Sequence, residues 1–362
     1  MSSSSYSTDS PSLSSIKPAS KTPLIDKDVA IFEQIFNNDS YSQSSNIPQI
    51  NWLIKDEIGY IDDVITKQEC NQLIDVINNH NSLSFWSDKG RDNQDTKAFR
   101  DADTIEIHSQ YISNILWIRI KSYINHISYH FNECDDGSEA WQVDLIGDWT
   151  STAINHDLLL ARYPSGGYFS PHTDGNVISN YNQRSFFSVI IFLNDVPYTH
   201  GGGIHIYALL IRTLLICTIT YCILIYTFNT YIYIYTHIGT KFYQDEASKN
   251  LHQSAPDQPW IASDIYCINE VNAVAGRFLF FNQKYVHEGV IPQAPYMKYI
   301  IRTDIMFTRS PLLLTAPEDT AAYALHQQAE VLAELGHTAE SVKMFRAAFK
   351  MSPALSRAMG QS

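Results

Sequence analysis

Two histidines and one aspartate have the residue types and the spacing of a metal site. His172 and Asp174 lie two residues apart, and on a β-strand residues i and i+2 point to the same side. An imidazole nitrogen and a carboxylate oxygen could therefore bind one ion. His287, which follows the apolar segment 276–281, is the candidate for a second imidazole from a distant strand. Two imidazoles and one carboxylate on one face of an ion leave its other positions open, an arrangement suited to Fe(II).

A single His-x-Asp motif predicts little, because a solvated histidine beside a turn aspartate is common. In this chain three further features accompany the motif. Tyr163-Pro-Ser-Gly-Gly precedes it, His287 stands in His-Glu-Gly, and a basic segment with Lys298 and Arg302 follows. The combination is far more specific than any of its parts.

The elements that must position these residues are strands and helices of different periodicity. Turn signals bound several apolar segments that we predict to be strands: 52–54, 59–61, 158–163, 186–193, 276–281 and 299–307. A helix is predicted after Thr66, a candidate N-cap with Glu69 three residues on, and a second helix over about 109–127. Helices packed on a β-sandwich or barrel give an α+β fold.

The 362-residue chain is acidic, with a formal net charge of -13 at pH 7. A general nucleic-acid binder needs a basic face, so we expect no nucleic-acid partner. The five cysteines form no CxxC pair, which argues against a disulfide framework and a structural zinc site. The N-terminal segment lacks the apolar core of a secretory signal, and we expect a cytoplasmic protein.

Residues 204–239 differ from their surroundings. They contain no Asp, Glu, Pro or Lys and are dominated by Ile, Leu, Thr and Tyr. Three explanations remain open: translated intron sequence, a real insertion, or a membrane span, for which roughly 20 apolar residues are enough. Arg212 and the polar residues argue against a span, and AT-rich non-coding DNA read in frame would give this mixture. We favour the intron interpretation and expect no membrane association.

The segments around the candidate ligands resemble the prolyl 4-hydroxylase α-subunit-like Fe(II)/2-oxoglutarate dioxygenases. The resemblance runs from about Gly59 to Arg309 and is interrupted by 204–239. Members of that family have Gly-Gly-x-Thr-x-Phe-Tyr after the strand that ends in Phe-Leu-Asn. Removing 204–239 joins Gly203 to Thr240 and restores Gly-Gly-Gly-Thr-Lys-Phe-Tyr, which supports the intron interpretation.

The resemblance implies a double-stranded β-helix (jelly-roll) core with supporting helices. It implies that three residues bind Fe(II) and are catalytic: His172, Asp174 and His287. It also implies that a cation, either Lys298 or the runner-up Arg302, binds the outer carboxylate of 2-oxoglutarate, and that the Tyr163 hydroxyl donates to the same carboxylate. Lys298 lies one residue further from the distal histidine than is usual in the family, so both cations stay candidates.

The activity implied by the resemblance is hydroxylation of a C–H bond by O2, with release of succinate and CO2. The family also implies ascorbate (vitamin C) as the reductant and a protein or peptide substrate, with proline as one candidate side chain. The alternative is a non-catalytic interaction protein on an oxygenase fold that the 204–239 insertion disrupts. Chelation of 2-oxoglutarate by a bound metal would distinguish the two hypotheses.

We expect three parts along the chain. A Ser-rich disordered tail covers 1–46, the dioxygenase domain covers 47–312, and a helical hairpin covers 313–362. The pattern of the hairpin resembles one tetratricopeptide repeat. One repeat cannot bury its own face, so the hairpin should pack on the main domain or on a protein partner.

Overall fold

The computed structural model describes residues 26–36, 49–131, 145–197, 239–243, 251–255 and 258–360. The anomalous segment 204–239 lies outside the described residues except for Gly239.

Two antiparallel sheets form the body of the described chain. The larger sheet has 11 strands. They are β1 (Asn51–Ile54), β2 (Ile58–Ile61), β3 (Ser84–Phe85), β4 (Asp103–His108), β5 (Ser128–Phe131), β6 (Gly147–Ile154), β7 (Asp157–Tyr163), β9 (Ile178–Asn180), β10 (Gln183–Phe192), β15 (Phe278–Asn282) and β17 (Lys298–Ser310). The smaller sheet consists of β8 (Phe169–His172), β11 (Gly239–Tyr243), β14 (Cys267–Asn272) and β16 (Val286–Gly289). A short pair, β12 (His252–Gln253) and β13 (Trp260–Ile261), and the 3-10 turn η7 (Asp264–Tyr266) complete this region.

Eight of these strands have the order of a jelly roll. Four neighbours in the larger sheet, β15-β10-β17-β7, pack against the smaller sheet, whose order is β14-β11-β16-β8. Along the chain these eight strands alternate between the two sheets. Among the eight, only β11 and β14 follow one another within the same sheet. The predicted α+β class is confirmed, and the strand order agrees with the jelly roll that the sequence resemblance implies.

The long apolar strands of the larger sheet are buried on both faces. In β15, Phe278 and Phe280 pack into the core under the helices, whereas Leu279 and Phe281 pack into the core between the sheets. Because side chains alternate across a strand, burial of both faces requires a continuous apolar run. The same alternation in β10 leaves Ser188 on the face toward the smaller sheet, beside Ile190.

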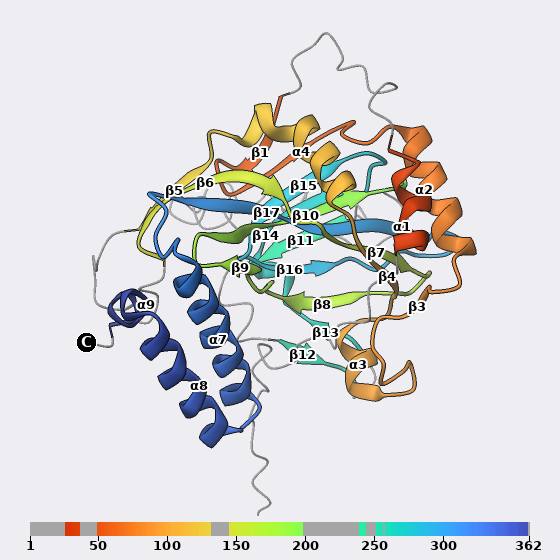
Figure 1. Ribbon diagram of the computed structural model, residues 1–362. Helices are drawn as coiled ribbons and strands as arrows, with labels where there is room; N and C mark the ends of the chain where they lie inside the picture. Colours follow the sequence, from red (N-terminus) through yellow and green to blue (C-terminus); the bar gives the residue numbers. More distant parts are fainter. Residues whose placement is uncertain are drawn as a thin grey trace, which may run out of the picture.

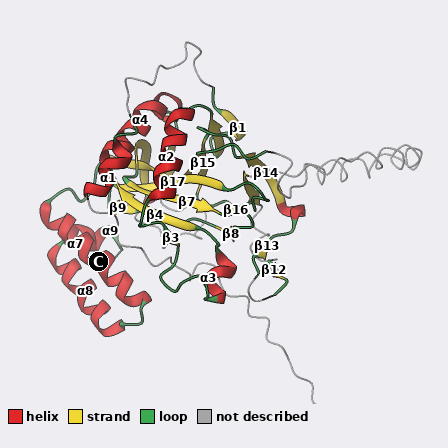
Figure 2. Cartoon of the chain, turned by 90° about the vertical axis from the view of Figure 1, so that its right-hand side faces the viewer, coloured by secondary structure: helices red, strands yellow, loops and turns green. Residues whose placement is uncertain are grey.

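Several helices cover the outer face of the larger sheet (Figures 1 and 2). They are α1 (Asp26–Glu33), α2 (Lys67–Asn79) and α4 (Gln110–Ile124), while α3 (Gln94–Phe99) lies near β8. The capping box predicted at the start of α2 is present, since Glu69 N donates to Thr66 Oγ1 and Thr66 N donates to Glu69 Oε2. Glu69 also pairs bidentately with Arg119, which ties α2 to α4.

The helix α1 lies within the predicted disordered tail 1–46, so that prediction was wrong for residues 26–36. Val29, Phe32 and Phe36 are buried in the core that α2 and α4 share with the larger sheet. The segment is too short to form a stable helix alone, and its order comes from this burial.

The C-terminal part contains α7 (Pro317–Glu334), α8 (Thr338–Met351) and α9 (Pro353–Ala358). They pack on one another and reach the jelly roll where Tyr323 meets Tyr181, next to β9, in an edge-to-face contact. Figure 1 shows them apart from α1, α2 and α4. The likeness of α7 and α8 to a tetratricopeptide repeat stays a prediction, as do the boundaries of the three predicted parts. In the part of the chain that the structure describes, every helix is too short or too polar to cross a membrane.

Candidate metal centre

His172 and His287 meet across the smaller sheet. His172 ends β8 and His287 lies in β16, and the two residues are directly paired in the antiparallel register of these strands. Their ring centroids are 4.3 Å apart. The pairing of β8 with β16 therefore brings together two histidines that are distant in the sequence.

Asp174 completes this group from the loop after β8. Its Oδ1 lies 3.6 Å from His172 Nε2, and its Oδ2 lies 3.5 Å from His287 Nε2. Two further side chains hold the carboxylate: Ser188 Oγ donates to Oδ2 at 2.5 Å, and Arg302 Nη2 lies 3.5 Å from the same oxygen. Sequence analysis did not single out Ser188, although a lone serine inside an apolar strand was a signal that this position faces something polar.

The backbone fixes which nitrogen of each ring faces the aspartate. His172 Nδ1 lies 2.8 Å from the carbonyl oxygen of Ser170, and His287 Nδ1 lies 3.1 Å from that of Tyr285. A carbonyl oxygen only accepts, so each Nδ1 carries the proton and the lone pair of the neutral ring lies on Nε2. Two lone pairs and one carboxylate therefore converge.

Burial and charge favour the protonation states that bind metal. Burial, and next the neighbouring His172, lower the pKa of His287 to about 3, so this ring is neutral at pH 7. Burial alone would raise the pKa of Asp174, but the Arg302 guanidinium and then His287 outweigh it and hold this pKa well below its ordinary value. Neutral imidazole and ionised carboxylate are the forms that act as ligands.

Aromatic side chains shield the two histidines from water. Phe169 stacks on His172 with 3.6 Å between ring centroids, and Phe99 lies 6.0 Å from the same ring. Phe281 packs against His287 with 4.5 Å between ring centroids. Both histidines are buried. Charge interactions are stronger in such surroundings than in water.

Lys298 and Tyr163 lie together near the histidines. They are directly paired in the register of β17 and β7, and both are buried. Lys298 Nζ is 4.7 Å from the centroid of the Tyr163 ring and donates to the Val290 carbonyl at 3.1 Å. A Cβ on Gly289 would lie 3.3 Å from Nζ, so the ammonium group stands beside the residue two positions after His287. Two residues along a strand span about 6.6 Å, a separation that a five-carbon diacid held at the metal could bridge.

Arg100 is a third member of this end of the site, and sequence analysis missed it. Its guanidinium carbon lies 5.5 Å from the centroid of the Tyr163 ring and 4.7 Å from that of Phe169. The residue is 6% exposed, and in the described part of the chain its Nε has no hydrogen-bond partner. A nearby anion would stabilise a buried cation whose hydrogen-bonding groups are not all paired. Its position in Ala98-Phe99-Arg100-Asp101, before β4, gave no signal, because only the bridge between Arg100 and Phe169 brings it to the site.

Arg302 is engaged at the other end of the same strand face. Its Nη1 lies 3.0 Å from Asp304 Oδ2, and its Nη2 reaches Asp174. Asp304 is fully buried and accepts further hydrogen bonds from Gln283 and Asn155. Four residues on a strand span about 13 Å, so Lys298 and Arg302 serve different parts of the site. Of the two cations predicted for the outer carboxylate, Lys298 is the one beside Tyr163.

The donor set fits a divalent ion of intermediate softness. It offers two imidazole nitrogens and one ionised carboxylate, and each histidine is oriented by a second hydrogen bond, as metal-binding histidines usually are. Mg²⁺ and Ca²⁺ prefer oxygen ligands alone, whereas Fe(II) commonly binds this set with open positions. The residues present therefore fit Fe(II).

Comparisons with known proteins gave matches among solved structures only. No protein-family model matches the chain, and none of the curated proteins is similar to it in sequence. The similar structures include prolyl hydroxylases and other 2-oxoglutarate-dependent enzymes. A Pseudomonas putida prolyl-4-hydroxylase is 12% identical, with 71% of this chain and 94% of that chain covered and a TM-score of 0.34. A Trichoplax adhaerens prolyl hydroxylase in complex with a hypoxia-inducible-factor peptide is 13% identical, with 72% and 86% covered and a TM-score of 0.38.

A third similar structure is the viral collagen prolyl hydroxylase of Paramecium bursaria Chlorella virus-1 in complex with 2-oxoglutarate. It is 11% identical, with 70% of this chain and 96% of that chain covered and a TM-score of 0.35. TM-scores this low do not establish an activity, so the proposal below depends on the geometry of the site itself.

Proposed function

We propose that this chain is an Fe(II)- and 2-oxoglutarate-dependent dioxygenase. The observation that carries the proposal is the convergence of His172 Nε2, His287 Nε2 and the Asp174 carboxylate, each oriented by its own hydrogen bonds. Three ligands on one face leave room for a chelating co-substrate and O2. Fe(II) and 2-oxoglutarate, when bound, supply the oxidation of an unactivated C–H bond by O2, with succinate and CO2 as products.

The residues of this chain have distinct tasks in that reaction. His172, Asp174 and His287 would hold the metal, and Ser188 and Arg302 are positioning residues that fix the carboxylate of Asp174. The aromatic rings on the histidines exclude water, which limits unproductive oxidation.

Lys298 and Tyr163 would bind the outer carboxylate of 2-oxoglutarate. Burial raises the pKa of Tyr163, with Arg100 opposing the shift, so its hydroxyl stays protonated and can donate. The ammonium group of Lys298 supplies a point charge rather than a bidentate fork. Because both groups are rigidly paired between β7 and β17, they need little rearrangement to receive the anion.

For the substrate we propose a protein side chain, with proline as the first candidate. Support comes from the sequence around Tyr163-Pro-Ser-Gly-Gly and His172, which resembles that of prolyl 4-hydroxylase-like enzymes. The arrangement and orientation of the triad argue against the alternative, a non-catalytic interaction protein.

The deciding experiment is an anaerobic titration of the full-length protein with Fe(II) and then 2-oxoglutarate. We expect the visible charge-transfer band of the metal–keto-acid chelate, which reports both ligands without knowledge of the substrate. The same titration on a chain without residues 204–239 is the comparison. A band only in the shortened chain would mean that the chain with residues 204–239 is inactive. If neither chain gives the band, the proposed function is wrong.

We also expect the affinity for 2-oxoglutarate to fall as the pH rises from 7 to 9. Burial lowers the pKa of Lys298 to about 7, with Glu288 and Glu270 opposing the shift and Arg100 adding to it. A bound carboxylate favours the charged amine, so above pH 7 binding must take up a proton, whereas below pH 7 the amine is already charged. Affinity should be flat below pH 7 and fall by up to about tenfold per pH unit above it.

The measurement is the dissociation constant of 2-oxoglutarate at saturating Fe(II), without oxygen, between pH 6 and 9. Calorimetry at pH 8 in two buffers of different ionisation enthalpy should detect proton uptake. Lys298→Arg, which stays charged, serves as the control and should bind independently of pH. Equal pH dependence in this variant and in the wild type would assign the effect to another group.

A further inference from the structure

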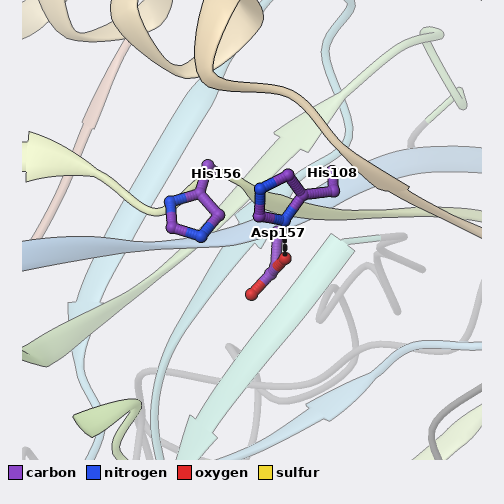
Figure 3. A group of neighbouring side chains, drawn as sticks. All are labelled: His108, His156 and Asp157. Carbon is purple, nitrogen blue, oxygen red and sulfur yellow. Dashed lines mark hydrogen bonds and ion pairs between the residues drawn. The ribbon is translucent and has the colours of Figure 1, made fainter. Parts of the chain in front are cut away.

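A second group of metal-ligating side chains lies far from the proposed iron centre. His108 is the last residue of β4, Asp157 is the first residue of β7, and His156 precedes Asp157 in the turn from β6. Figure 3 shows the two imidazole rings side by side with the carboxylate against His108. The described residues contain this group and the His172 group as potential metal sites.

The backbone holds the three side chains in one place. His108 and Asp157 are directly opposite in the antiparallel register of β4 and β7, and Ser109 N donates to the His156 carbonyl at 2.8 Å. Residues opposite one another in such a pair have their Cβ atoms roughly 5 Å apart, so their side chains meet without any rearrangement of the chain.

The ligand atoms are already close to binding positions. His108 Nδ1 and Asp157 Oδ1 are 2.8 Å apart, the two ring centroids are 4.2 Å apart, and one ligand atom from each residue lies within 4.8 Å of the other two. Ligands about 2.0–2.1 Å from a tetrahedral ion are roughly 3.3 Å from one another. His108 and Asp157 are more than half exposed, so small side-chain rotations can close the difference.

We propose that His108, His156 and Asp157 form a second metal site, open to solvent, for a divalent transition ion of the Zn²⁺ class. Two imidazole nitrogens and one carboxylate oxygen are the ligands that Zn²⁺, Co²⁺ and Ni²⁺ favour, and water completes the coordination. Mg²⁺ and Ca²⁺ are disfavoured because two of the three ligands are nitrogens. This inference is independent of the proposed oxygenase function.

The second site is separate from the first. Asp157 and Tyr163 are at opposite ends of β7, and six residue steps along a strand span about 20 Å. Tyr163 is the member of β7 beside the proposed 2-oxoglutarate end of the site. An ion at His108 would therefore link the end of β4 to the β6–β7 turn without touching the iron ligands.

The chain contains a matched control for this site. His130 Nδ1 and Asp148 Oδ1 are 2.6 Å apart, and both side chains are exposed, as in the pair of His108 and Asp157. The described residues offer no second histidine in a ligand group with that pair. If an exposed His–Asp pair alone were enough, both places would bind metal equally.

The test is a Zn²⁺ titration of the full-length protein against a chromophoric chelator, with wild type, the double variant His108→Asn/His156→Asn, and the control His130→Asn. We expect the double variant to bind one ion fewer per chain than wild type and the control to bind the same number. Equal numbers in wild type and the double variant would overturn the proposal.

Chemical protection gives a second result that does not depend on how the variants fold. In the wild-type protein, Zn²⁺ should slow modification of His108 and His156 by diethyl pyrocarbonate, mapped by mass spectrometry, while His130 reacts at an unchanged rate. Protection of all three histidines to the same degree would mean non-specific binding and would also reject the site.

Discussion

Replacing His172 by alanine is expected to abolish the charge-transfer band and 2-oxoglutarate turnover together. His172 is one of the three protein ligands that we propose for the metal, and its Nε2 lies 3.6 Å from Asp174 Oδ1. Loss of groups that merely orient a ligand costs about 10- to 100-fold in metal affinity or activity, so loss of the ligand itself should cost roughly 100-fold or more. Equilibrium dialysis with Fe(II) measures the loss of metal affinity, the anaerobic titration measures the loss of the band, and release of succinate measures turnover.

The control for this prediction is His337→Ala, which removes an exposed histidine at the start of α8. It should leave both the band and the metal affinity unchanged. His287→Ala should behave like His172→Ala, because the two rings occupy equivalent places about Asp174. A His172→Ala protein that still formed the chelate would show that the ion binds elsewhere.

The triad could be predicted from sequence because two kinds of local pattern determine it. The spacing of His172 and Asp174 places both on one side of a strand end, and the apolar run that forms β15 leads through a short turn into β16, the strand of His287. What the sequence did not contain was the pairing of β8 with β16, which a long-range register determines. The family resemblance supplied that link.

The groups around the triad were only partly predictable. Lys298 and Tyr163 were identified by resemblance, and their direct pairing across β7 and β17 places both side chains at one end of the site. Arg100 was missed because a bridge to Phe169, not a motif, brings it to the site. Arg302 was the runner-up to Lys298 for the same carboxylate, and the shared strand face could not reveal that its partners are Asp174 and Asp304.

The fold followed from periodicity wherever one pattern dominated. The continuous apolar runs in β10 and β15 were recognised as strands, and their burial on two faces explains why no polar alternation interrupts them. The helix α1 was missed because polar residues surround its few apolar positions, and only tertiary burial orders it.

Residues 240–243 are an instructive case of local sequence and global topology agreeing. The segment was predicted to resume a motif after 204–239, and in the structure β11 starts at Gly239 and pairs with both β14 and β16. Phe242 is directly opposite His287. The strand that flanks His287 therefore begins where the anomalous composition ends, which strengthens the interpretation of 204–239 as foreign to the domain.

Lys298→Met is expected to weaken 2-oxoglutarate binding by roughly 100-fold, since the loss of one partner of a buried charge pair costs at least 2–3 kcal/mol. Arg100→Met should weaken it by roughly tenfold, because this cation lies beside the Tyr163 ring and would act on the anion at longer range. Lys284→Met removes an exposed lysine that pairs with Glu57 and should leave the affinity unchanged. Anaerobic titration of the Fe(II)-loaded proteins gives all three dissociation constants.

The stability of Lys298→Met distinguishes a binding role from a structural one. Burial lowers the pKa of Lys298 to about 7, so at neutral pH the fold partly disfavours the charge that it encloses. Methionine keeps most of the length of the side chain and carries no charge, so the midpoint of thermal unfolding should stay equal or rise. If Lys298 instead supported the fold, its replacement would lower both the stability and the affinity for 2-oxoglutarate. Weaker binding in an equally stable protein would mean that the chain retains a costly buried cation because an anionic co-substrate requires it.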